Sequence, residues 1–324
     1  MKIDCHVHVV GNGTGGTGCW YRPRGVTRYG APHMLRAVGL PPSALTGDLD
    51  GLYARQVLRF IRESSLDAAV ILAQDEPYRD DGTIIADTGS FYVPNDFVLG
   101  LARQHREFLP AVSIHPARRD AREELERCLE AGAVMLKCLP NCQNIDWNDR
   151  RHTRFLERMA ESGLILLAHT GSERTLPVIA PKLADPRVLT RALEIGVTCI
   201  AAHSGTGMMV LDPDYFEVFA EMTTRFPRLY GDNSALACFN FRFRRSTWKR
   251  MIEAGLAERI LHGSDVPVPV TAALMWSFGM MKWGHWRETS RIGNPIERDA
   301  QIKRHLGFGE DTFTRLAGLL RKTG

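Results

Sequence analysis

Short apolar segments that resemble buried β-strands recur eight times along the chain, and several are followed by a stretch with helical periodicity. The strand-like segments are residues 2–9, 68–72, 109–114, 133–138, 164–168, 197–202, 228–231 and 259–261. The amphipathic stretches are residues 53–63, 119–130, 149–161, 215–225 and 246–256. Alternation of this kind is typical of parallel βαβ units whose strands are buried on both faces. By itself the pattern fits a closed barrel and an open doubly wound sheet equally well.

The length and composition are those of one large globular domain. A chain of 324 residues with 44% hydrophobic and 24% charged residues can bury a large core without disulfides, and α/β barrels often run past ~200 residues as single units. The seven cysteines are scattered and odd in number, which does not resemble a disulfide framework. We find no internal repeat and no domain boundary, and therefore expect one domain over residues 1–324.

The sequence gives little sign of a membrane or nucleic-acid partner. Its first ten residues, MKIDCHVHVV, are too short and polar for a signal peptide, and no apolar run approaches the ~18 residues of a membrane span. A basic cluster is better explained as a solvated helix start than as a nucleic-acid patch, because no DNA- or RNA-binding motif accompanies it; it comprises Arg242, Arg244, Arg245, Lys249 and Arg250. We expect a cytoplasmic protein that acts on a small molecule and could form a homo-oligomer.

Residues that can bind a metal lie at or just after the ends of five of the strand-like segments. They are His6 and His8, Lys137, His169, His203 and Asp265. Side chains alternate across a strand, so His6 and His8 point to the same face, and in a barrel the strand ends converge on one mouth. Imidazole and carboxylate are the usual ligands of zinc and neighbouring metals. Their joint occurrence predicts a metal site.

Single histidines elsewhere have a plainer explanation. A lone strand-end histidine is more often a hydrogen-bonded polar residue than a ligand, and we assign His115 in this way. His262 is out of step with Asp265 and is expected to pack outward. Asp4 shares the parity of His6 and His8, so it either orients a ligand from one layer below or is structural. Asn233 and Ser234 are expected to face the mouth, where they could contact substrate.

Three irregular segments follow strands and should lie at the face where barrels build their active sites: residues 11–50, 74–94 and 266–300. The glycine run at 11–18 lacks the Lys-Ser/Thr of a phosphate-binding loop, and we interpret it as a flexible lid or substrate loop. Four residues near it could bind an anionic or aromatic substrate, or be ordinary loop residues: Trp20, Tyr21, Arg22 and Arg24.

The motifs IDCHVHV, LLAHTG, AAHSG and HGSDVP resemble the metal-ligand motifs of the amidohydrolase superfamily. The segment GAVMLKCLPNCQNIDWND is similar to the fourth-strand pattern of its "amidohydrolase 2" branch, which includes aminocarboxymuconate-semialdehyde decarboxylase and related hydrolases. The resemblance runs from residue 1 to about 270, and the C-terminal helix over residues 310–320 also fits. It implies a TIM (β/α)8 barrel that needs a divalent metal, with zinc as the expected ion, in one or two copies.

The resemblance also implies roles for the site residues. His6, His8, His169 and Asp265 would be the primary metal ligands, and Asp265 would also handle a proton. His203 would be a ligand of a second metal or an electrostatic group beside the bound water. Lys137 matches a lysine that is carboxylated and bridges two metals in binuclear relatives, whereas the decarboxylase branch lacks it. The alternative is an unmodified lysine that binds a substrate carboxylate or neutralises the ligands.

These features favour a metal-dependent hydrolase that attacks an ester, lactone or amide carbonyl with metal-bound hydroxide, which a metal can supply near neutral pH. Asp265 and His203 are its expected catalytic residues, and all six site residues are candidate metal ligands. The alternative is a metal-dependent non-oxidative decarboxylase of an aromatic or unsaturated carboxylic acid. A catalytically silent metal-binding or regulatory barrel is disfavoured, because all the expected ligands are present.

Overall fold

The computed structural model describes residues 1–23, 26–238, 245–253 and 255–321. Eight parallel strands form one sheet in the order β1-β3-β5-β6-β7-β8-β9-β10. Their bounds are β1 (Ile3–His8), β3 (Ala68–Leu72), β5 (Phe108–Val112), β6 (Met135–Cys138), β7 (Ile165–His169), β8 (Cys199–Ala202), β9 (Leu229–Asp232) and β10 (Ile260–Leu261). Each overlaps a strand that the sequence predicts.

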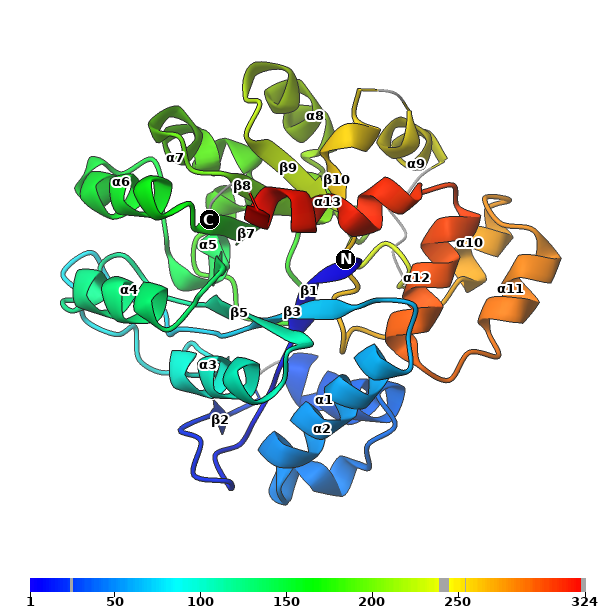
Figure 1. The fold of residues 1–324 in the computed structure, drawn as a ribbon, viewed down its shortest axis with the longest axis horizontal. Helices are drawn as coiled ribbons and strands as arrows, with labels where there is room; N and C mark the ends of the chain where they lie inside the picture. The colour runs from blue at the N-terminus through cyan, green and yellow to red at the C-terminus, as the bar shows by residue number, and fades with distance from the viewer. Residues whose placement is uncertain (24–25, 239–244, 254, 322–324) are drawn as a thin grey trace.

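The sheet curls into a barrel whose seam lies between β1 and the segment after β10. Across this seam the Cys5 amide donates to the His262 carbonyl and the His8 amide to the Val266 carbonyl, both at 2.9 Å. Figure 1 shows the strands at the centre with the helices around them. The fold is therefore the predicted (β/α)8 barrel, and the open doubly wound sheet is excluded.

The helices cover the outside of the barrel and one of its ends (Figure 1). The outer ones are α2 (Leu49–Arg62), α3 (Asn95–Gln104), α4 (Ala121–Glu130), α6 (Thr153–Ser162), α7 (Thr190–Ile195), α8 (Phe216–Arg225), α9 (Arg245–Ile252) and α12 (Pro295–His305). Helix α13 (Glu310–Arg321) places Leu316 and Ala317 in the same apolar cluster as Ile3 and Ala68 at the strand starts. It therefore closes the N-terminal end of the barrel.

Further short elements connect these parts. They are α1 (Val26–Ala37), α5 (Pro140–Gln143), α10 (Ala273–Ser277), α11 (Trp283–Thr289), the 3₁₀ helix η1 (Pro42–Thr46), and the antiparallel pair β2 (Trp20–Tyr21) and β4 (Phe91–Tyr92). No helix among the described residues combines the length and apolar character needed to cross a membrane. All seven cysteines are buried free thiols, whereas a disulfide framework would require them to be paired.

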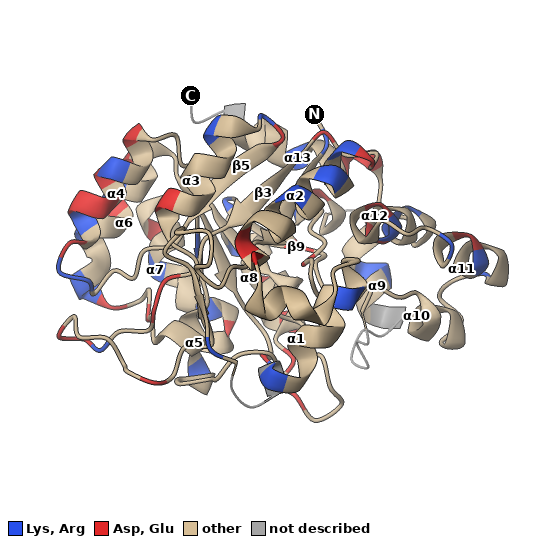
Figure 2. Ribbon diagram, turned by 90° about the horizontal axis from the view of Figure 1, so that it is seen from below, with Lys and Arg blue, Asp and Glu red and all other residues tan. Residues whose placement is uncertain are grey.

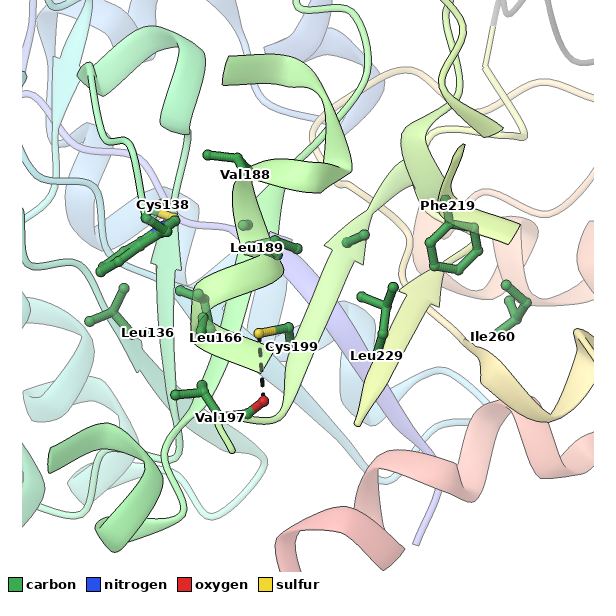
Figure 3. Close-up of a cluster of buried hydrophobic side chains, with 14 of the residues drawn as sticks. Leu136, Cys138, Leu166, Val188, Leu189, Val197, Cys199, Phe219, Leu229 and Ile260 are labelled. Atoms are coloured by element: carbon green, nitrogen blue, oxygen red, sulfur yellow. Dashed lines mark hydrogen bonds between the residues drawn. The ribbon is translucent and has the colours of Figure 1, made fainter. Parts of the chain in front are cut away.

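Strand side chains alternate between the barrel interior and the layer beneath the helices. On β6, Met135 belongs to the interior cluster and Leu136 to the outer one. Figure 3 shows the outer layer, where Leu166 and Leu229 on the strands lie near Val188 and Phe219 from outer segments. Figure 2 shows charged residues of both signs spread over the outer helices. Arg250 of the predicted basic cluster pairs there with Glu217, whereas Arg242 and Arg244 lie outside the described residues.

Two expectations about the first part of the chain are wrong. Residues 11–50 were expected to lack regular structure, but they contain α1, which has Gly30 and Pro32 within it and so lacks a clear helical signal. The glycine run is also not a free lid. Its amides at Asn12 and Gly13 and the Thr17 hydroxyl all bond the carboxylate of Asp50, which is 1% exposed. A Cβ on Gly11 would collide with that carboxylate at 2.4 Å.

Candidate metal centre

Three side chains from opposite ends of the chain meet at the C-terminal mouth of the barrel. Nε2 of His6 lies 3.3 Å from Nε2 of His8. Oδ1 of Asp265 lies 3.3 Å from the first of these nitrogens and 3.2 Å from the second. Two ligands about 2.0–2.1 Å from a tetrahedral zinc ion would be ~3.3–3.4 Å apart. The triangle therefore has the dimensions of one face of a zinc coordination shell.

Two more histidines complete the cluster. His203 offers a nitrogen within 4.8 Å of the ligand atoms of His6 and Asp265, and its ring centre lies 4.9 Å from that of His169. Nε2 of His169 is buried and has no hydrogen-bond partner among the described residues, although Oε2 of Glu173 lies 3.8 Å away. Burial lowers the pKa of His6 to about 3 and that of His169 well below its ordinary value. Neutral imidazoles with unshared electron pairs are the form that binds a metal.

Lys137 reaches the same centre from β6. Its side chain is 1% exposed, and Nζ lies 3.1 Å from Nε2 of His6. Burial lowers the pKa of Lys137, and the carboxylates of Asp265 and Asp232 oppose this effect. The structure thus brings together all six residues that the sequence nominates, and their imidazole and carboxylate donors fit a divalent metal.

Asp232, at the end of β9, is a site residue that sequence reasoning missed. It is completely buried, and its Oδ2 accepts a hydrogen bond from Nδ1 of His6 at 2.9 Å. This contact places the His6 proton on Nδ1 and leaves Nε2 free to bind a metal. Burial alone would raise the pKa of Asp232, but the hydrogen bond from His6 holds it well below its ordinary value. Its position at a strand end in YGDNS was the available signal.

The other oxygen of Asp232 organises His203. Oδ1 accepts from the Ser234 hydroxyl at 2.5 Å and from the His203 amide at 2.7 Å. The Ser234 hydroxyl in turn lies 2.8 Å from Nδ1 of His203. Ser234 was expected to face the mouth, but it is fully buried behind His203, as is Asn233, whose Oδ1 accepts from the Gly263 amide. Both residues follow Asp232, the last residue of β9, and it is the Asp232 side chain that contacts His6.

The segment carrying Asp265 is fixed from two sides. Asp265 has a left-handed backbone, with φ of 65°, and its amide donates to the His6 carbonyl at 2.8 Å. Burial opposes its charge, but His6, His8 and His203 hold the pKa of Asp265 well below its usual range. Lys303 on α12 donates to the Gly263 carbonyl, and Asp4 accepts from the Ser264 amide at 2.9 Å. These bonds fix the strained turn that carries the carboxylate.

Asp4 does not lie below the ligands on the inner face. The register of β1 against β3 is irregular between Asp4 and Val7, so the period of two is broken and Cys5 joins the interior cluster instead. Asp4 holds the β1 seam, where burial raises its pKa to about 6. His262 packs on Phe313 of α13, as expected for an outward residue. His115 is not among the residues that line the cavity. Its Nε2 donates to the Gln143 carbonyl at 2.9 Å, and its Nδ1 accepts from the Ala117 amide at 3.1 Å.

A cavity of about 880 Å³, measured with its open mouth, leads to the cluster. His6, His8, Lys137, His169, His203 and Asp265 all line it. Its opposite wall is apolar and comes largely from α1, η1 and α2. Of the loop residues that the sequence nominates, Tyr21 lines the cavity, whereas Trp20 stacks on Tyr92 and Arg22 lies over Trp20. Arg24 lies outside the described residues.

Glu173 is a second residue that sequence reasoning missed. It lies four residues after His169 and lines the cavity. One carboxylate oxygen, Oε1, accepts from the Thr175 hydroxyl at 2.5 Å and the Leu176 amide at 3.0 Å. The other faces His169 at 3.8 Å. The segment after β7 thus adds a second carboxylate to the mouth, and no strand-end pattern marks it.

Comparisons with known proteins agree with this arrangement. A family model described as Amidohydrolase matches residues 3–278. No curated protein matches the chain. Among solved structures, an uncharacterized TIM-barrel protein from Bordetella bronchiseptica is 17% identical, covers 94% of this chain and 99% of its own, and has a TM-score of 0.57.

Two further solved structures are similar in fold. A proposed 2-pyrone-4,6-dicarboxylic acid hydrolase from Pseudomonas putida is 15% identical with a TM-score of 0.57, over 98% of this chain and 97% of its own. An IDCase from Metarhizium anisopliae is 12% identical with a TM-score of 0.52, over 99% of this chain and 97% of its own. At these identities the likeness concerns the fold alone.

Proposed function

Because the chain belongs to the amidohydrolase family, in its amidohydrolase 2 branch, and is an enzyme of this metal-dependent superfamily, we propose that it hydrolyses an ester, lactone or amide bond of a small molecule. The observation that carries the proposal is the triangle of His6, His8 and Asp265. Its three donor atoms are spaced as the ligands of one metal ion would be, and one of them belongs to a carboxylate at the mouth of a cavity.

We assign the metal to His6, His8, His169 and Asp265, with zinc as the expected ion. His203 and Lys137 stand next to these donors and would hold a second ion if one binds, Lys137 as a carbamate. A divalent metal bound there supplies Lewis acidity, which polarises a carbonyl and makes water a stronger acid. With one ion, Lys137 remains an ammonium that balances the surrounding carboxylates.

The remaining steps belong to residues of the chain. Asp265 accepts the proton of the attacking water and passes it to the leaving oxygen or nitrogen, the usual task of a carboxylate within hydrogen-bond reach. Ser234 accepts a hydrogen bond from Nδ1 of His203, which leaves Nε2 of His203 free to bind a second metal. If no second metal binds, a protonated Nε2 can stabilise the negative charge that develops on the carbonyl oxygen. The apolar wall excludes bulk water from this exchange.

Metal content and activity can be tested separately. Protein purified without chelators should contain one or two divalent ions per chain by elemental analysis. Asp265→Asn should keep much of the metal on the histidines while kcat/KM falls ~10²–10⁴-fold, the usual contribution of a proton-transfer group. His203→Asn should also lose activity, with full metal content if one ion binds and reduced content if two do. His115→Asn, at a buried histidine outside the cavity, is the matched control.

The assay should cover esters, lactones, amides and aromatic carboxylic acids. Turnover of one acyl class by the wild type, and its loss in Asp265→Asn but not in His115→Asn, is the expected result. Decarboxylation of an acid without turnover of any acyl compound would overturn the proposed hydrolysis and leave the metal centre intact.

A further inference from the structure

The wall that faces the metal centre is built almost entirely from apolar side chains. Helix α1 contributes Ala31, Met34 and Leu35, η1 contributes Leu45 and α2 contributes Leu49. Ala31, Leu35 and Leu49 are themselves buried. A surface of this kind binds an apolar group by releasing water and offers nothing to a charged one.

The charged residues that the structure describes around the cavity also disfavour an anionic substrate. Among the cavity-lining residues that the structure describes, Lys137 is the sole lysine or arginine, whereas Asp265 and Glu173 are carboxylates. Asp232 adds a third carboxylate directly beneath His6. One divalent ion and one ammonium balance these three charges, and so would two ions with a Lys137 carbamate. Arg174, in an adjoining hollow, is already paired with the buried Asp212.

One polar group in the apolar wall lacks a partner among the residues that the structure describes. Tyr53 lines the cavity and is 0% exposed, and its buried hydroxyl makes no hydrogen bond within the described part of the chain. Burial, and secondarily Asp265, raises the pKa of Tyr53, so the hydroxyl keeps its proton and can donate it. A buried hydroxyl left unpaired is unfavourable. A ligand oxygen is the natural acceptor in a cavity that is otherwise apolar on this side.

We propose that the substrate is an uncharged molecule whose apolar part lies against α1, η1 and α2 and whose oxygen accepts a hydrogen bond from Tyr53. This inference rests on the proposed hydrolysis for the position of the reacting carbonyl, but it concerns a different wall of the cavity. It excludes substrates that carry a carboxylate or sulfonate remote from the reacting bond.

Binding of matched probes tests the proposal without turnover. Suitable probes are 2-acetylnaphthalene, its isostere 2-isopropenylnaphthalene, in which CH2 replaces the carbonyl oxygen, and 6-acetylnaphthalene-2-sulfonate. Their binding to the metal-loaded protein is compared by equilibrium dialysis. The sulfonate should bind at least ~100-fold more weakly than the neutral ketone, because an unpaired charge would be buried. Tyr53→Phe should weaken the ketone ~2–10-fold, leave the hydrocarbon unchanged and not lower the melting temperature.

A gain of function provides the complementary test. Met34→Lys places a cation in the wall. It should reduce the ratio of the sulfonate's dissociation constant to that of the neutral ketone at least tenfold. His33→Lys adds the same charge at an exposed neighbouring position that does not line the cavity, and should change nothing. If Met34→Lys does not fold, Leu45→Lys replaces it in this test, because Leu45 on η1 is half-buried and also lines the cavity.

The outcomes separate this proposal from the proposed hydrolysis. Equal binding of ketone and sulfonate, or no binding of either, overturns the substrate class even if acyl compounds are hydrolysed. The expected preference in a protein that hydrolyses no acyl compound would refute hydrolysis and retain the substrate class. An unchanged ketone affinity in Tyr53→Phe would remove the role of the hydroxyl.

Discussion

Replacing Asp232 by asparagine should weaken metal binding, although this residue is not itself assigned as a ligand. Its carboxylate accepts from Nδ1 of His6 through one oxygen, and from the Ser234 hydroxyl and the His203 amide through the other. An amide of the same shape has only one acceptor oxygen. If that oxygen serves the Ser234 side, the amide nitrogen faces Nδ1 of His6, and the His6 proton moves to Nε2, where the metal should bind.

The size of the effect follows from this loss. Residues that orient a ligand typically contribute 10–100-fold to metal affinity, which is about 1.4–2.7 kcal/mol. Free metal at 100 times the wild-type dissociation constant stabilises the fold by about 2.7 kcal/mol, whereas after a 100-fold weakening it gives only ~0.4 kcal/mol. Asp232→Asn should therefore show both a higher dissociation constant, by competition with a chromogenic chelator, and a smaller rise in melting temperature with zinc.

A matched control separates orientation from general damage. Asp50→Asn also changes a buried carboxylate that accepts several hydrogen bonds, but Asp50 does not line the cavity. It should lower the melting temperature and leave the zinc dissociation constant unchanged. If Asp232→Asn binds zinc as tightly as the wild type, the assignment of the His6 tautomer, and with it the role of Asp232, is refuted.

Three further results are expected. Lys137→Ala should lose about half of the bound metal if two ions share a carbamate, and elemental analysis showing full content would support an unmodified lysine. Burial lowers the pKa of His115 from 6.5 to about 4, so its contribution to stability is complete above pH 6.5 and is lost as the pH falls towards 4. The free energy of unfolding, measured by urea titration, should therefore drop by up to ~3 kcal/mol over that range. The drop should be smaller in His115→Phe. Asp50→Asn should cost ~1–3 kcal/mol in the same titration, because the amides of the glycine run lose their acceptor.

The sequence predicts the barrel and the group of side chains at its mouth because both leave a local pattern in the sequence. Each buried strand is a continuous apolar run, and a polar residue at its end stands out against that background. His169 and Lys137 were found in this way, and the structure brings them to the same mouth as His6. Their roles as ligands stay predictions, as does the single domain over residues 1–324.

The features that the sequence does not reveal depend on irregular backbone or on contacts distant in sequence. Asp4 was placed on the inner face because strict alternation was assumed, and the irregular register of β1 breaks it. Helix α1 was missed because Gly30 and Pro32 mask its periodicity, and burial of Ala31 and Leu35 compensates for their poor helix propensity. Asp232 was passed over because its partner, His6, is 226 residues away.

Residues at the strand ends and residues in the segment before β3 form different parts of the site. The strand ends, which rigid β-ladders fix, carry the proposed donors His6 and His169, together with the carboxylate of Asp232, which orients His6. The wall opposite comes from residues 26–53, which form α1, η1 and the start of α2 outside the strands. We therefore expect substitutions in that segment, such as Met34→Lys, to change which molecule binds without moving a proposed metal ligand. Reaction type and substrate choice should vary independently in this barrel, since different parts of the chain determine them.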